Sequence, residues 1–259
     1  MSRLHRSLIV TVIFIFAGLA APTRAADAPA SRTFDARGVK LHYLIAGRGP
    51  AVVLIHGLHS SAEINWHLNG VLGELAKDHT VIAFDLPGHG RSDKPEADEA
   101  YGLRLVEDVV MLLDELKIKQ AQVVGYSLGG MVAMKLMVEH PERVSAGLLG
   151  GMGWLRDGSA LQRFWDQLPS REGGRTPAAC VRNVSKLAVT EEEVKRIRIP
   201  VEIVVGDRDP VKRLYVVPLE RIRPDWPVVE IEGAGHLSCI VKPPFRDAVA
   251  AWVRRNAQR

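Results

Sequence analysis

The stretch AQVVGYSLGG, residues 121–130, decides the fold of this chain. Residues 121–126 form a short and mostly apolar run, which is typical of a strand that is buried on both faces of a sheet. An apolar pattern of helical length follows over residues 128–140 and stops at Pro141. A strand that turns through a glycine-flanked serine directly into a helix exposes the serine hydroxyl on a sharp turn. The sequence therefore predicts an α/β fold with Ser127 at the carboxyl end of a central strand.

Steric crowding explains why glycines stand on both sides of this serine. Gly125 and Gly129 stand two positions on either side of Ser127, where side chains would collide in so tight a turn. The helix that begins at Leu128 points its positive end at the serine and favours an anion there. A G-x-S-x-G match alone is weak, but its place between strand and helix makes it specific, so a nucleophilic role for Ser127 is favoured over a purely structural turn.

Strands and helices alternate along the rest of the chain. Strands are expected at residues 39–45, 51–55, 81–84, 121–126, 144–149, 201–205 and 228–231, and helices at 66–77, 103–116, 128–140, 214–222 and 245–256. Residues 26–32 are expected to form a disordered leader. This alternation predicts a mostly parallel central sheet with helices on both faces.

Residues 151–198 interrupt the alternation, because they contain no convincing strand. A connecting loop of roughly 48 residues without structure would be unusual in a compact domain, so we interpret the segment as a short cap inserted between two strands. A helix is expected near its end, at residues 191–198. Its bulky apolar side chains either line the substrate pocket or pack the cap onto the sheet helices; they are Trp154, Leu155, Phe164, Trp165 and Leu168.

A serine needs a base to become a nucleophile at neutral pH. His236 follows the last expected strand on a glycine-rich loop, at the sheet edge where ligands collect in α/β proteins. An acid must orient that base, and Asp207 and Asp209 both follow the strand at 201–205. Either acid preserves the chain order Ser, Asp, His, so at this point both remain candidates.

The oxyanion of a reacting carbonyl needs fixed N–H donors. We expect them to be the backbone N–H groups of Leu128 and of Leu58, which lies in the turn after the strand at 51–55. His56 is expected to organise that turn rather than to act as a second base. A zinc site made of His56, His59 and His67 is not favoured, because their spacing is unlike that of usual ligands. No metal and no organic cofactor is expected.

Five motifs together resemble the α/β-hydrolase fold family over nearly the whole chain after residue 25. They are His56-Gly57, DLPGHGRS at 85–92, the serine turn at 125–129, GDRDP at 206–210 and Gly235-His236. In similar enzymes the acid stands three residues after the glycine that ends the strand, which implies Asp209 rather than Asp207. Residues 88–92 resemble a structural turn of the family, to which no catalytic role is given.

The resemblance also bears on the reaction. Some members of the family, such as haloalkane dehalogenases and epoxide hydrolases, have an aspartate nucleophile, and Ser127 argues against both. We expect a serine hydrolase that cleaves carboxylic esters of small soluble substrates. A carbon–carbon bond or amide hydrolase with the same triad is an alternative, and a receptor-like ligand-binding protein that retains the triad is an alternative of another class.

The first 25 residues have the order of a secretory signal peptide. Arg3 and Arg6 precede an uncharged run at residues 8–21, and the small-residue site Thr23-Arg24-Ala25 follows. The run has 14 residues, fewer than the roughly 20 that span a bilayer, which favours cleavage over a retained anchor. We therefore expect a signal peptide at 1–25, a hydrolase domain at 26–259, export to the periplasm or medium, and no stable membrane association after cleavage.

The net charge of +4 depends largely on this leader. Arg3, Arg6 and Arg24 lie in it without any acid, so the remaining chain carries +1. Such a balance does not suggest nucleic acid or an anionic membrane as a partner, and a small-molecule ester is the expected partner. Cys180 and Cys239 are either a disulfide pair, which export permits, or two buried thiols.

Overall fold

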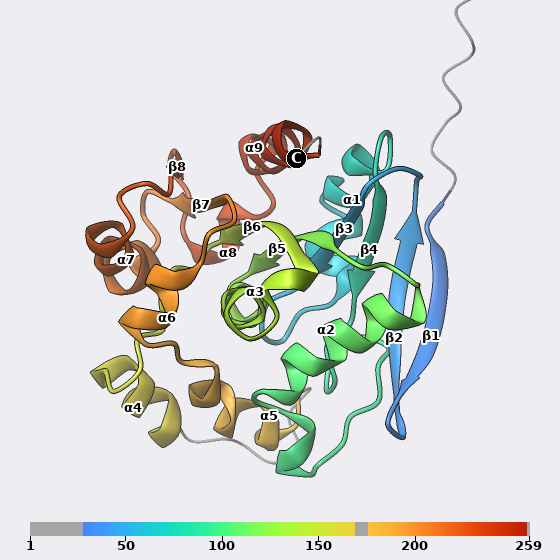
Figure 1. Cartoon of the computed structure of the whole chain (residues 1–259), viewed down its shortest axis with the longest axis horizontal. Coiled ribbons are helices and arrows are strands. Elements are labelled where there is room, and N and C mark those ends of the chain that lie inside the picture. Colours follow the sequence, from blue (N-terminus) through green and yellow to red (C-terminus); the bar gives the residue numbers. More distant parts are fainter. Residues whose placement is uncertain (1–27, 169–175, 258–259) are drawn as a thin grey trace, which may run out of the picture.

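The computed structural model describes residues 28–168 and 176–257. An eight-stranded sheet has the order β1-β2-β4-β3-β5-β6-β7-β8 (Figure 1). The pairs β1·β2 and β2·β4 are antiparallel and all others are parallel. The strands are β1 (Ala30–Ala36), β2 (Val39–Ala46), β3 (Ala51–Ile55), β4 (Thr80–Phe84), β5 (Ala121–Tyr126), β6 (Val144–Gly150), β7 (Val201–Gly206) and β8 (Val228–Ile231). This confirms the predicted α/β class with a mostly parallel sheet.

All seven predicted strands are present, but strand β1 was not predicted. Residues 30–32, expected within a disordered leader, belong to this strand, which pairs with β2 from Ala30 opposite Ile45 to Ala36 opposite Val39. Only Phe34 and Ala36 of its seven residues are buried. An edge strand that exposes most of its side chains carries little apolar pattern, and this is why the sequence did not reveal it.

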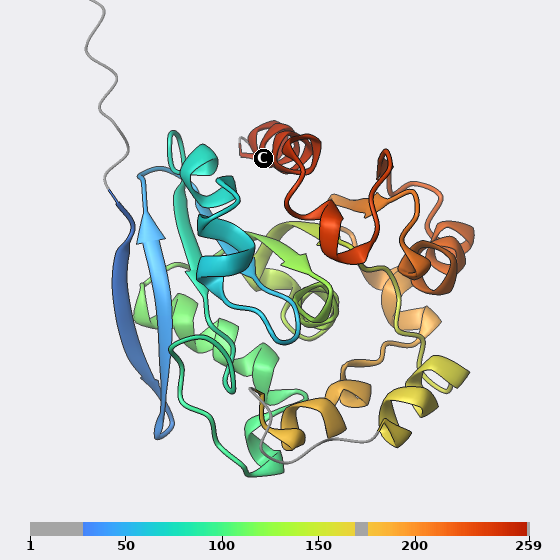
Figure 2. The ribbon, with the colours of Figure 1, turned by 180° about the vertical axis from the view of Figure 1, so that it is seen from behind.

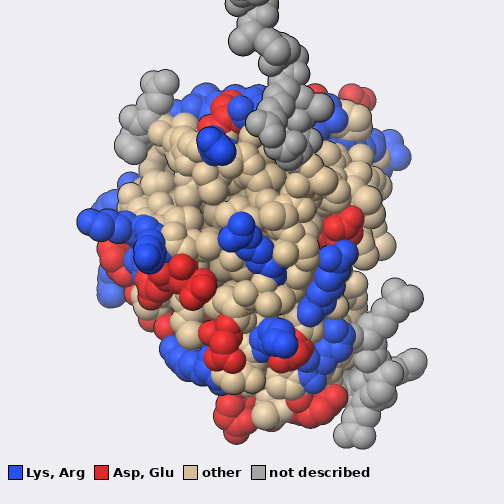
Figure 3. Space-filling model, turned by 90° about the vertical axis from the view of Figure 1, so that its right-hand side faces the viewer, with Lys and Arg blue, Asp and Glu red and all other residues tan. Residues whose placement is uncertain are grey.

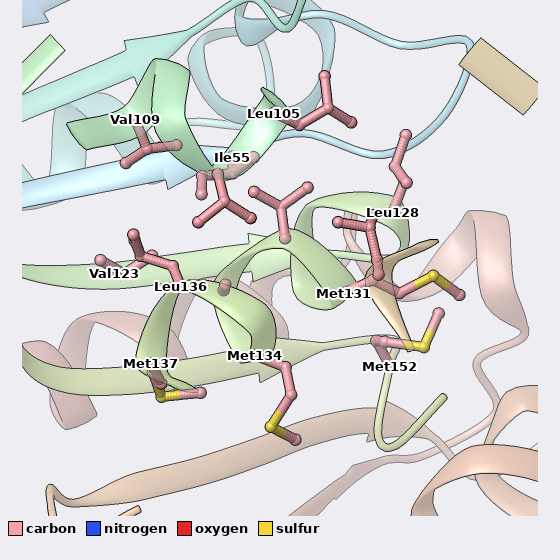
Figure 4. Close-up of a cluster of buried hydrophobic side chains, with 14 of the residues drawn as sticks. Ile55, Leu105, Val109, Val123, Leu128, Met131, Met134, Leu136, Met137 and Met152 are labelled. Atoms are coloured by element: carbon pink, nitrogen blue, oxygen red, sulfur yellow. The ribbon is translucent and has the colours of Figure 1, made fainter. Parts of the chain in front are cut away.

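Helices cover the two faces of the sheet (Figures 1 and 2). One face carries α2 (Arg104–Glu115) and α3 (Leu128–Glu139), and the other carries α1 (Val71–Leu75) and α9 (Pro243–Asn256). Side chains of each strand alternate between two apolar clusters: Val53 and Ile55 belong to the first, and Val52 and Leu54 to the second. In the first cluster, methionines and leucines of α3 pack against α2 and the sheet; Figure 4 labels Leu128, Met131, Met134, Leu136 and Met137.

Two predicted helices are divided. The segment expected as one helix at 66–77 consists of the π-helix η1 (Glu63–His67) and α1, separated at Gly70, whose φ of +81° cannot continue a helix. The segment expected at 214–222 consists of the π-helix η5 (Lys212–Val216) and α7 (Val217–Ile222). Short 3-10 turns occur at η2 (Asp98–Ala100) and η3 (Pro141–Arg143).

The described part of the segment between β6 and β7 contains short helices joined by loops. It contains α4 (Ala160–Gln167), α5 (Ala178–Arg182), the 3-10 turn η4 (Val184–Leu187) and α6 (Glu191–Arg196). Within its described part, the bridge between Arg156 and Val189 is isolated and no strand forms. Trp154 and Leu155 are buried in the first apolar cluster, whereas Phe164 is 54% exposed.

Charges of both signs are interspersed on the face over β1 and β2 (Figure 3). Within residues 28–168 and 176–257, no helix has the length and apolar character needed to cross a membrane. The expected signal peptide at 1–25 lies outside the described residues. Cys180 and Cys239 are both buried free thiols, and burial raises the pKa of the Cys239 thiol to about 11.

Candidate active site

Ser127 occupies a strained turn between β5 and α3. Its φ is +54°, in the half of backbone space that residues with a Cβ avoid. A Cβ on Gly125 would lie 2.1 Å from the carbonyl oxygen of Gly129, and one on Gly129 would lie 2.1 Å from that of Ile55. The close approach of three backbone segments therefore requires both glycines, as the sequence pattern predicts.

Three predicted side chains meet in one hydrogen-bonded row. The Nε2 atom of His236 lies 3.0 Å from the Oγ atom of Ser127, and its Nδ1 atom lies 2.8 Å from Oδ2 of Asp209. Asp209 is 4% exposed, and its Oδ1 accepts a hydrogen bond from the N–H of Val211 at 2.9 Å. Both carboxylate oxygens are thus engaged, which fixes the acid against the imidazole.

Asp207, the other candidate acid, contacts the backbone and not the imidazole of His236. Its Oδ1 accepts a hydrogen bond from the N–H of Ala234 at 3.0 Å, and backbone N–H bonding, chiefly from Gly233, lowers the pKa of its carboxyl group. The side chain therefore holds the loop that leads to His236 instead of contacting the imidazole. Of the two candidates, the geometry brings Asp209 to the base, as the family resemblance implies.

The two expected oxyanion donors flank the nucleophile. Leu128 is the first residue of α3, where backbone N–H groups have no partner within the helix. Leu58 follows Gly57 in the turn after β3 and lines the same pocket as Ser127. A Cβ on Gly57 would lie 3.2 Å from the Cβ of Ser127, so the turn passes close to the nucleophile. Their role as donors stays a prediction.

His56 joins two turns at this edge of the sheet. Its Nδ1 donates to the carbonyl oxygen of Gly57 at 2.7 Å, and its Nε2 accepts from the N–H of Leu86 at 3.1 Å. Burial lowers the pKa of this imidazole, which stays neutral. With both nitrogens in use, His56 organises the turn. Among the described residues, no cluster of His, Cys, Asp and Glu is arranged to hold a metal ion.

Asp85 holds the structural turn at 88–92 in place. Its Oδ1 accepts from the N–H of Ala62 at 2.7 Å, and its Oδ2 accepts from the N–H of Arg91 at 2.9 Å. The same Oδ2 bonds Nδ1 of His42 at 2.8 Å. Asp85 thus ties the turn after β4 to η1 and β2 and does not face Ser127.

Two residues that support the site were missed from the sequence. Asn65 accepts a hydrogen bond from the N–H of Gly57 at 2.9 Å and so fixes the turn that carries Leu58. Tyr126 donates its hydroxyl to the carbonyl oxygen of His236 and packs its ring 5.7 Å from the imidazole. Tyr126 stood in the serine motif as a freely variable position, and no motif includes Asn65.

A pocket of about 350 Å³ opens at Ser127 and His236. Its walls are mostly apolar and come from the turn after β3, from η1 and from α8 (His236–Cys239) with the residues that follow it; the apolar side chains are Leu58, Ile64, Leu237, Ile240 and Val241. None of the described residues of 151–198 lines it. The sequence left open whether the bulky cap side chains line the pocket or pack the cap onto the sheet helices. Trp154 and Leu155 do not line the pocket and pack in the first apolar cluster.

Comparisons with known proteins agree with this architecture. Residues 50–192 match the family model described as alpha/beta hydrolase fold. An uncharacterized protein of Mycobacterium tuberculosis is 40% identical over 137 residues, 51% of this chain and 38% of the relative. The 2-hydroxymuconate semialdehyde hydrolase of Pseudomonas sp. is 41% identical over 123 residues, 46% of this chain and 42% of the relative. The chain thus spans about two fifths of the length of these relatives.

The fold extends beyond the matched segment. The crystal structure of an epoxide hydrolase from Vigna radiata superposes with a TM-score of 0.72 at 18% identity, covering 88% of this chain and 99% of that one. At this identity the likeness concerns the fold. The family model covers more than half of the sequence, and the chain belongs to the α/β hydrolase fold family.

Proposed function

We propose that this protein is a serine hydrolase that cleaves carboxylic esters of small soluble substrates through an acyl-enzyme. The observation that carries the proposal is the row from Ser127 through His236 to Asp209, with distances of 3.0 and 2.8 Å. A nucleophile, a base and an orienting acid in this order are the arrangement of acyl-transfer enzymes.

The contacts of His236 with Ser127 and Asp209 suggest the order of the proton transfers. Asp209 accepts a hydrogen bond from the Nδ1–H of His236 and so keeps the ring proton on Nδ1. The free Nε2 then takes the proton of Ser127 as its Oγ attacks the carbonyl carbon. The N–H groups of Leu58 and Leu128 stabilise the oxyanion. The imidazolium then gives its proton to the departing alcohol. A water deprotonated by His236 releases the acid and restores Ser127.

A second candidate is the hydrolysis of carbon–carbon bonds with the same residues. It is favoured by the 41% identity to the 2-hydroxymuconate semialdehyde hydrolase of Pseudomonas sp.. A ligand-binding protein of the receptor type is the third. It would bind in the same pocket but complete at most a few cycles.

Turnover by the purified protein separates these candidates. p-Nitrophenyl butyrate, a p-nitroanilide of the same acid and 2-hydroxymuconate semialdehyde should be compared under multiple-turnover conditions. We expect many cycles on the ester and a kcat/KM that exceeds those on the other two. Faster cleavage of the semialdehyde would assign the second candidate, and a few cycles at most on every substrate would assign a binding protein.

The size of the pocket predicts a preference for short acyl chains. Its volume of about 350 Å³ is near the lower end of the usual range for ligand pockets, roughly 300–1,000 Å³. Leu237, one of the residues that line it, is 85% exposed, so a long chain would extend into solvent. The kcat/KM for p-nitrophenyl esters should be highest between acetate and hexanoate. A maximum at palmitate, with activation at a lipid interface, would contradict this prediction.

The proposal includes export of the protein. Its basis is the leader, in which Arg3 and Arg6 precede the uncharged run at 8–21 and the site Thr23-Arg24-Ala25. Protein isolated from the native host should therefore begin at Ala26 or within a few residues of it. N-terminal sequencing of the periplasmic or extracellular fraction tests this. Intact Met1 in membrane-bound material would support a retained anchor instead.

A further inference from the structure

The base of the triad lies on a very short element. His236 is the first residue of α8, which ends only three residues later at Cys239. One turn of helix has too few internal hydrogen bonds to be stable by itself. The contact between Nδ1 and Asp209 orients the imidazole, but it does not hold the backbone that carries the ring. The place of Nε2 relative to Ser127 therefore depends on what fixes this turn.

Tyr126 contacts the backbone of this turn through its hydroxyl group. The hydroxyl donates a hydrogen bond to the carbonyl oxygen of His236. Burial raises the pKa of the hydroxyl, so it stays protonated and able to donate. The thiol of Cys239 and the backbone N–H of Ile240 also interact with this hydroxyl. A single oxygen atom thus connects Tyr126 to both ends of α8.

The ring of Tyr126 is tightly packed. The residue is 3% exposed, and its ring meets that of Phe245 in α9 edge to face, with 5.5 Å between the ring centroids. The backbone at the end of β6 also lies close to the ring. A Cβ on Gly150 would lie 2.8 Å from Cδ2 of Tyr126, and one on Gly151 would lie 2.7 Å from Cζ. The hydroxyl is therefore held at a fixed place relative to the sheet.

The same residue directly precedes the nucleophile. The N–H of Ser127 donates to the carbonyl oxygen of Gly150 at 2.9 Å, so the nucleophile and the ring of Tyr126 are fixed against one strand. One side chain thus links the turn that carries the nucleophile to the turn that carries the base. The proton must pass over the 3.0 Å between Oγ of Ser127 and Nε2 of His236. A shift of about 1 Å between such groups can slow a reaction roughly 100-fold.

We propose that Tyr126 is a positioning residue of the reaction, whose hydroxyl keeps His236 aligned with Ser127. The proposal rests on the proposed function, because it concerns the same nucleophile and the same base. Tyr126 acts through the backbone of His236 and not through contact with the reacting atoms. Its hydroxyl should therefore affect the rate of the reaction more than the binding of the substrate.

Tyr126→Phe tests this role, because it keeps the ring and removes only the hydroxyl. We expect kcat on p-nitrophenyl butyrate to fall about 10- to 100-fold, since His236 serves both the formation and the hydrolysis of the acyl-enzyme. When both steps slow together, KM stays nearly unchanged and kcat/KM falls by the same factor as kcat. The rate constant for labelling of Ser127 by a fluorophosphonate probe should fall as well.

Tyr101→Phe is the matched control. Tyr101 is likewise 3% exposed and donates its hydroxyl to a backbone carbonyl, that of Pro95 at 2.7 Å, but it does not line the catalytic pocket. A general loss of stability should therefore appear in both variants as a lower melting temperature. When rates are measured well below both melting temperatures, only Tyr126→Phe should lose kcat and label more slowly.

The possible results separate this role from the proposed function. Unchanged kcat and labelling in Tyr126→Phe, or equal losses in the two variants, would overturn the positioning role. Slower labelling of Tyr126→Phe in a protein that turns over no ester would overturn the proposed reaction and keep the role of Tyr126. A protein whose Ser127 does not react with the probe at all would overturn both.

Discussion

Replacement of Ser127 by alanine is expected to reduce ester hydrolysis on the order of 10⁵- to 10⁶-fold, as in other enzymes that lose the serine of a triad. The substitution removes the only atom that the Nε2 of His236 contacts within hydrogen-bond distance among the described residues. Without Oγ no acyl-enzyme forms, and catalysis is limited to whatever the oxyanion donors give to attack by water. Rates on p-nitrophenyl butyrate measure this loss, and circular dichroism shows whether the fold is retained.

Covalent labelling tests whether Ser127 itself is the nucleophile. Ser127→Ala should escape a fluorophosphonate probe, whereas Ser185→Ala should be labelled like the unaltered protein. Ser185 is a suitable control because it is buried, at 5% exposure, and does not line the pocket at Ser127. Full labelling of Ser127→Ala would show that another side chain is the nucleophile.

Replacement of Asp209 by asparagine should lower kcat by up to about 10⁴-fold, because it changes the tautomer of His236. The N–H of Val211 donates to Oδ1 of residue 209, so an amide would keep its oxygen there and turn its NH₂ toward Nδ1. Nδ1 would then have to accept, and the ring proton would move to Nε2. In that form His236 cannot take the proton of Ser127.

Asp207→Asn is the matched control for this prediction. Its carboxylate receives a backbone hydrogen bond from Ala234 and does not contact the imidazole, so kcat should change far less. Steady-state rates of the two variants on one ester show which of the two acids orients His236. A larger loss for Asp207→Asn would show that the orienting acid had been misassigned.

The parts of the fold that the sequence predicted are those in which burial is continuous. β3 and β5 are buried along almost their whole length, so their apolar runs mark their ends closely. β1 is mostly exposed, and its residues 30–32 were assigned to a disordered leader. The segment expected as one helix at 66–77 is interrupted at Gly70, which the sequence did not reveal because hydrophobic periodicity does not report a left-handed backbone conformation.

Some residues of the candidate site could be predicted from the sequence and others could not. Ser127 and His236 stand in local motifs at strand ends, and their placement at one sheet edge follows from parallel topology. The choice between Asp207 and Asp209 depends on a loop conformation, and only the family resemblance separated them. The role of Asn65 depends on its contact with the N–H of Gly57 in the turn after β3, and no motif in the sequence records that contact.

The separation of the triad along the chain has a consequence for its biosynthesis. His236 is 109 residues beyond Ser127 in sequence. Asp209 follows β7 and His236 begins α8 after β8, and these two strands lie at one end of the sheet order. A ribosome that has not yet made these strands has produced the nucleophile without its base. Under the proposed mechanism, nascent chains and fragments that end before residue 201 should therefore lack esterase activity, and the onset of activity would indicate that β7 and β8 have joined the sheet.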